Sequence, residues 1–101
     1  MRVTALTTDL LDRSRFPDGV AFVRRADALD VAAEVIVVDL SRPDALEGVR
    51  RLRAAGSGAR IVAYGSHVER ALLAAARDAG CDDVLARSAF FADVVDALGL
   101  R

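Results

Sequence analysis

The stretch Val35-Ile36-Val37-Val38-Asp39 decides the fold of this chain. Its unbroken apolar, β-branched run predicts a strand that is buried on both faces, as strands of parallel sheets are. Asp39 then closes the run and places a carboxylate where the strand ends. In open α/β sheets this carboxyl edge is where ligands bind and chemistry takes place. The sequence therefore makes Asp39 the centre of a candidate site.

Strand and helix patterns alternate on both sides of this run. Short β-branched or aromatic segments predict further strands at 3–6, 20–23, 60–64 and 84–86. Helical spacing or alanine-rich composition predicts helices at 10–16, 27–33, 44–55, 68–79 and 90–98, of which the first two are short. This alternation, with short loops, implies a parallel sheet with helices on both faces. We expect a single doubly wound α/β domain of (βα)5 type spanning residues 1–101, with no output domain attached.

Composition and charge exclude several roles. The formal net charge is −1, which predicts no basic surface for nucleic acid or for an anionic membrane. The longest apolar run is far shorter than the roughly 18 residues of a membrane span, and no signal peptide follows Met1. The single cysteine, Cys81, cannot form an internal disulfide, which suits a reducing compartment. We therefore expect a cytoplasmic protein that binds neither nucleic acid nor membranes.

Polar residues follow the other predicted strands as well. Because the carboxyl ends of parallel strands meet at one edge of the sheet, these residues are predicted to share a pocket with Asp39. The predicted pocket comprises Thr8, Asp9, Asp39, Ser41, Arg42, Gly65, Ser66, His67, Arg87 and Ser88.

The order and spacing of these residues resemble a bacterial receiver domain of two-component signalling. Asp39 is followed by Pro43 four residues on, as in the family's acceptor loop. Tyr64-Gly65-Ser66 ends the fourth strand, where the family places a small hydroxyl residue, and an alanine-rich helix with an Ala-Gly turn precedes a last strand that leads to Arg87. The resemblance covers nearly the whole chain. It implies a flavodoxin-like sheet of strand order 2-1-3-4-5, and Asp39 as a candidate phosphoacceptor.

The expected metal site departs from the family pattern. A receiver normally carries two acidic residues after its first strand, which hold Mg²⁺ together with the acceptor aspartate. Here the segment is Thr7-Thr8-Asp9, so at most one acid is present. Mg²⁺ requires an oxygen shell that includes carboxylates. Asp9 and Asp39 are therefore only weak metal candidates.

Three further motif positions are altered. Gly65 stands where the family has threonine or serine, and Val84 stands at the family's switch aromatic. Arg87 replaces the lysine, and Ser88 replaces the proline that usually follows it. Arginine carries its charge in a rigid planar fork and is not equivalent to lysine.

Three functions remain open on the sequence. The preferred interpretation is a stand-alone pseudo-receiver, a non-enzymatic module that needs no cofactor and regulates signalling by binding other proteins. In this hypothesis Arg87 pairs with Asp39 and takes the place of the metal ion. The alternative is a working single-domain response regulator, phosphorylated on Asp39 with Mg²⁺ held partly by Asp9. The third is a small enzyme or ligand-binding protein that uses the same pocket with His67.

Phe90 and Phe91 raise a separate question. They are adjacent in a predicted helix, so both are not expected to point into one core. One of them is predicted either to lie in a protein interface, where aromatic residues are favoured, or to cover the loop after the fifth strand. The sequence names no partner, and a homodimer is one option.

Overall fold

The computed structural model describes residues 1–100 and contains one sheet of five parallel strands. The strands are β1 (Val3–Leu6), β2 (Val20–Val23), β3 (Val35–Asp39), β4 (Arg60–Gly65) and β5 (Asp83–Ala86). Their order in the sheet is β2-β1-β3-β4-β5, and every neighbouring pair is parallel. The predicted α/β fold and strand order are confirmed.

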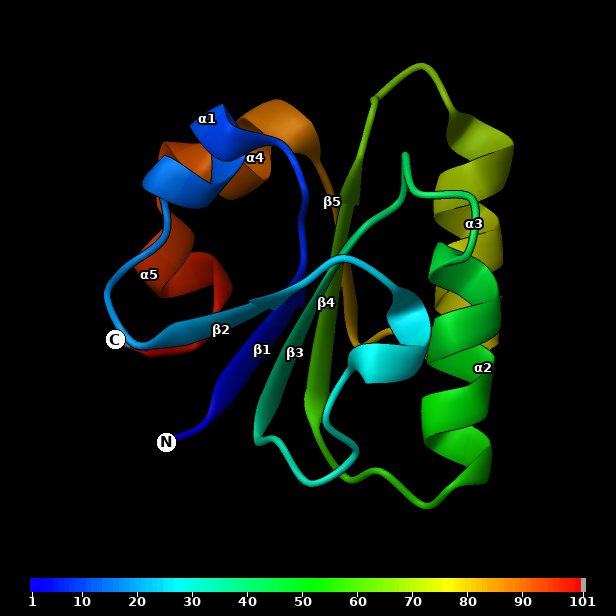
Figure 1. The fold of residues 1–101 in the computed structure, drawn as a ribbon. Coiled ribbons are helices and arrows are strands. Elements are labelled where there is room, and N and C mark those ends of the chain that lie inside the picture. The colour runs from blue at the N-terminus through cyan, green and yellow to red at the C-terminus, as the bar shows by residue number, and fades with distance from the viewer. Residues whose placement is uncertain (101) are drawn as a thin grey trace.

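Helices cover both faces of the sheet, as Figure 1 shows. One face carries α2 (Ala45–Ala54) and α3 (Arg70–Ala79), together with the 3-10 turn η1 (Ala26–Ala28). The other face carries α1 (Leu10–Ser14), α4 (Arg87–Ala92) and α5 (Val94–Ala97). Within residues 1–100 no helix is long and apolar enough to cross a membrane.

Two of the predicted helices differ from the observed ones. The segment predicted as a helix at 27–33 forms only η1, because Leu29 turns to an extended backbone and Asp30 accepts a hydrogen bond from the N–H of Ala32. Such local side-chain bonds compete with a helix. The helix predicted at 90–98 begins earlier, at Arg87, and breaks at Asp93. Asp93 leaves the helical region with φ −154° and ψ 88°, and its carboxylate caps α5 by accepting from the N–H of Asp96.

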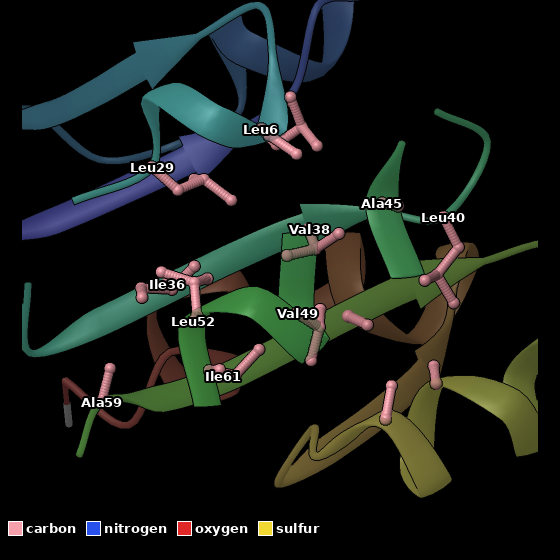
Figure 2. Close-up of a cluster of buried hydrophobic side chains, with 14 of the residues drawn as sticks. Leu6, Leu29, Ile36, Val38, Leu40, Ala45, Val49, Leu52, Ala59 and Ile61 are labelled. Carbon is pink, nitrogen blue, oxygen red and sulfur yellow. The ribbon is translucent and has the colours of Figure 1, made fainter. Parts of the chain in front are cut away.

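The sheet divides the hydrophobic core into two clusters. Successive side chains of β3 point to opposite faces. Ile36 and Val38 therefore pack toward α2 and α3, in the cluster that Figure 2 shows, while Val35 and Val37 belong to the cluster on the other face. Asp39 continues the register of Val35 and Val37. It also pairs in register with Tyr64 of β4, so the two side chains share the face that carries α1, α4 and α5.

Candidate functional site

Asp39 is the last residue of β3 and is only 5% exposed. Its Oδ1 accepts two hydrogen bonds from Ser41, one from the backbone N–H at 2.9 Å and one from the hydroxyl at 2.8 Å. Both bonds fall on Oδ1. The carboxylate is thus held by the loop that follows its own strand, and within residues 1–100 it forms no ion pair.

Asp9, the predicted second acid of the metal site, caps the N-terminus of α1. It is exposed, and its Oδ1 accepts from the backbone N–H groups of Leu11 at 2.8 Å and Asp12 at 3.1 Å, which caps α1. Beside the end of β1, Arg42 instead donates from Nη1 to the hydroxyl of Thr8 at 3.5 Å. Among the described residues no three His, Cys, Asp or Glu side chains gather closely enough to hold a metal ion. The carboxylates near Asp39 therefore do not fit the two-acid magnesium shell that the resemblance implies.

The loop after β4 provides no hydrogen bond to the Asp39 carboxylate among the described residues. Gly65 is buried, and a Cβ at this position would lie 3.3 Å from Leu40 Cβ and 3.4 Å from a methyl group of Leu73. A side chain at this position would be tightly packed, which favours glycine where the family has a hydroxyl residue. Ser66 and His67 are both exposed, and the Ser66 hydroxyl only accepts a long 3.5 Å bond from the N–H of Val68. Among residues 1–100 neither side chain forms a hydrogen bond or an ion pair with Asp39.

The hypothesis that Arg87 pairs with Asp39 is wrong. Arg87, the first residue of α4, forms a two-point ion pair with Asp12 of α1: Nη1 donates to Oδ2 at 2.6 Å, and Nη2 donates to Oδ1. The Asp12 side chain is 1% exposed, whereas that of Arg87 is 46% exposed. Arg87 binds Asp12 in preference to Asp39 because α1 directs the Asp12 carboxylate inward beneath α4. Both carboxylate oxygens of Asp12 can then accept from the planar guanidinium group. Asp39 instead has its Oδ1 occupied by Ser41.

The Asp12–Arg87 pair belongs to a larger buried network. The hydroxyl of Tyr64 donates to Asp12 Oδ2 at 3.2 Å and lies 3.2 Å from the hydroxyl of Thr7. We call Thr7, Asp12, Tyr64 and Arg87 the Asp12 network. Burial raises the pKa of the Tyr64 hydroxyl, which therefore stays protonated and remains a donor, and the hydrogen bonds to Asp12 raise the pKa of Arg87. The network ties β1 and β4 to α1 and α4.

Sequence reasoning missed Asp12 and Tyr64 as site residues. In α1 Leu10 is 76% exposed and Leu11 is 73% exposed, while Asp12 is buried. The sequence feature that could have indicated these residues was Tyr64, a tyrosine near the end of an apolar strand. A buried tyrosine hydroxyl usually has a hydrogen-bond partner, which predicts a polar side chain nearby.

Phe90 and Phe91 pack in one aromatic cluster, but only Phe90 is fully buried in the core, as the expectation that the two rings do not share one core position predicts. Phe90 is fully buried and stacks on Tyr64 with ring centroids 4.7 Å apart. Phe91 is half-buried and meets the rings of Tyr64 and Phe16 edge-on. The rings fit together because Phe90 reaches the sheet while Phe91 lies at the rim between α4 and α1. Ser88, on the same helix, is exposed.

Comparison with solved structures relates this geometry to known proteins. The isolated receiver domain of RcsB from Salmonella enterica serovar Typhimurium, in its apo form, superposes with a TM-score of 0.72 at 19% identity, over 98% of this chain and 85% of that one. A LuxR-family two-component response regulator from an Aurantimonas species superposes with a TM-score of 0.72 at 22% identity, over 98% of this chain and 82% of that one. A response regulator from Burkholderia pseudomallei with a phosphorylated aspartic acid superposes with a TM-score of 0.67 at 21% identity, over 97% of this chain and 66% of that one.

No protein-family model matches the chain, and no curated protein sequence matches it. The structural likenesses establish the fold: the chain folds as response-regulator receiver domains do.

Proposed function

We propose that this chain is a pseudo-receiver, a module with the receiver fold that regulates signalling by binding other proteins and is not phosphorylated by the magnesium-dependent route. The observation that carries the proposal is the pairing of Arg87 with Asp12 in place of Asp39.

Phosphoryl transfer depends mainly on positioning and on neutralising the charge of the transferred group. Two groups that would serve this purpose are engaged elsewhere. The cation after β5, Arg87, is committed to Asp12, and the acid after β1, Asp9, caps its own helix. A phosphoryl group on Asp39 would add negative charge to a carboxylate that has no ion-pair partner among residues 1–100. This arrangement disfavours the phosphorylated state.

The pairing of Arg87 with Asp12 also favours a fixed position of α4 relative to α1, and so a surface whose shape does not change. Arg87 bridges α4 to α1, and Asp12 is also bound by Tyr64 from the sheet. Moving α4 relative to α1 would leave the buried carboxylate of Asp12 without its cation, which is costly. A surface of fixed shape suits a protein that binds its partner without a phosphorylation signal.

A second function has one specific observation in its favour. Both hydrogen bonds to Asp39 fall on Oδ1, so its Oδ2 is not engaged by Ser41 and is the atom that would accept a phosphoryl group in a working response regulator. The Burkholderia neighbour contains a phosphorylated aspartic acid. This alternative requires Arg87 to leave Asp12, or another cation to take its place.

Amide NMR spectra recorded with and without Mg²⁺ and beryllofluoride, a phosphoryl mimic, separate the two functions. The pseudo-receiver predicts unchanged spectra, identical to those of an Asp39→Asn variant under the same conditions. Shift changes centred on Asp39 and Ser41 that disappear in Asp39→Asn would establish the phosphoacceptor function and overturn the proposal.

A further inference from the structure

A hollow of about 400 Å³ lies between the end of α1 and the outer face of α4. It is lined by Arg15, Arg87, Ser88, Phe91 and Ala92. The last three lie three and four residues apart, on one side of α4, which presents small side chains around the half-buried ring of Phe91. Figure 1 shows α1 and α4 side by side on this face of the molecule. We call this region the α1–α4 groove.

Two guanidinium groups are held over the same ring in this groove. The Arg15 guanidinium lies 5.4 Å from the centroid of Phe91, and that of Arg87 lies 5.1 Å from it. Stacking of this kind restrains the arginine side chains and so lowers the entropy that a ligand must remove on binding. The groove therefore presents one oriented guanidinium that forms no ion pair among residues 1–100, that of Arg15, beside that of Arg87, which already binds Asp12.

The charge of the groove is not balanced from within. Arg87 is neutralised by Asp12, but Arg15 forms no ion pair among the described residues, and no carboxylate lines the groove. Arg13 of the same helix is also without an ion pair in residues 1–100 and is held 4.7 Å from the ring of Phe22. The whole chain has a net charge of −1, so this positive surface is local. Such a surface attracts a negatively charged partner.

An exposed apolar side chain lies about one helical turn from Arg15. Leu11 is 73% exposed and precedes Arg15 by four residues, so both lie on one side of α1. Protein interfaces combine apolar contact area with a polar rim. The complementary ligand is one that offers carboxylates and an apolar side chain together.

We propose that the α1–α4 groove docks an acidic, leucine-bearing segment of a partner protein. A carboxylate of the partner pairs with Arg15 beside Phe91, and an apolar side chain of the partner covers Leu11. The proposal rests on the protein-binding role proposed above and specifies its surface and the chemistry of its partner.

The test uses two synthetic helical peptides, one of Glu and Leu and one in which Lys replaces every Glu, titrated into the ¹⁵N-labelled full chain. The acidic peptide is expected to shift the amides of Leu11, Arg15, Ser88, Phe91 and Ala92, and the basic peptide is expected to leave them unchanged. Arg15→Glu should weaken acidic-peptide binding at least tenfold. Arg50→Glu, at an exposed position of α2 on the opposite side of the sheet, should change it less than twofold.

Failure to shift these amides, or an equal loss in both variants, would overturn the docking proposal. Equal losses would mean that binding follows overall charge and not the groove. This failure is distinguishable from failure of the pseudo-receiver proposal, because the beryllofluoride experiment reports on Asp39, which does not line the groove.

Discussion

At the scale of single residues, the two inward-facing carboxylates Asp12 and Asp39 have different environments. Asp12 is bound by a guanidinium and a tyrosine hydroxyl, and comes from a helix. The Asp39 carboxylate, among residues 1–100, is bound only by Ser41, from the loop next to it. Removing the cation from a buried carboxylate leaves an uncompensated charge, whereas Ser41 can still donate to a neutral amide. The two sites should therefore respond differently to substitution.

Arg87→Met should lower the free energy of unfolding by about 2–4 kcal/mol, below the full cost of breaking a buried pair because the arginine is nearly half exposed. Asp39→Asn should lower it by about 1 kcal/mol or less, because the bonds from Ser41 have an acceptor in either case. Urea unfolding followed by circular dichroism measures both changes. A larger loss for Asp39→Asn than for Arg87→Met would contradict the assignment of Asp12 as the partner of Arg87.

At the scale of elements, the contact between η1 and α2 depends on a glycine in the middle of a helix. A Cβ on Gly48 would lie 2.5 Å from the Cβ of Ala26, closer than the two atoms can approach. Glycine is normally unfavourable inside a helix. Glycine is present here because η1 approaches α2 so closely that a larger side chain would not fit. This close approach lets the connection between β2 and β3 pack on α2 although it contains no full helix.

Gly48→Ala should therefore destabilise the protein by about 1–3 kcal/mol, although alanine favours a helix by about 1 kcal/mol over glycine. The clash with Ala26 outweighs the propensity. Thermal unfolding measures the effect, and Gly58→Ala is the matched control, since a Cβ there meets nothing within 4 Å. The double variant Ala26→Gly, Gly48→Ala should recover most of the loss. No recovery would show that the contact with η1 is not the cause.

Prediction from sequence succeeded best for elements with a strong periodic pattern. α2 and α3 lie within the predicted ranges 44–55 and 68–79, because their apolar residues recur at helical spacing. The short elements were less predictable. α4 and α5 are separated by a single aspartate that caps the second of them, and such a cap inside an apparently continuous helix is difficult to distinguish from a surface residue.

At the scale of the whole molecule, the sheet order sets where the structure is most stable. β3 lies at the centre of the sheet, between β1 and β4, and all five of its residues are buried. β2 lies at an edge, and none of its residues is fully buried. Local opening is easiest where few apolar contacts must be broken.

Native-state hydrogen exchange followed by NMR should therefore show the slowest amides in β3 and in the neighbouring β1 and β4. Amides in β2, α1 and α5 should exchange faster, because these elements are short and lie at the edge or surface. Equal protection of β2 and β3 would contradict this gradient and would indicate that the edge strand is covered, for instance by a second molecule.

The strand order was implied by the resemblance to receiver domains. The sequence pattern by itself determined the alternation of strands and helices, the helix cover on both faces of the sheet and the position of Asp39 at the carboxyl edge. These follow from local periodicity and from the buried run 35–38, and both are properties of neighbouring residues. Only the tertiary structure decided which acid Arg87 binds. Asp12 and Arg87 are far apart along the chain, and their contact depends on how α1 and α4 pack together and on the inward direction of one carboxylate. Local pattern cannot specify that direction, because in α1 the leucines face solvent and the aspartate faces the core.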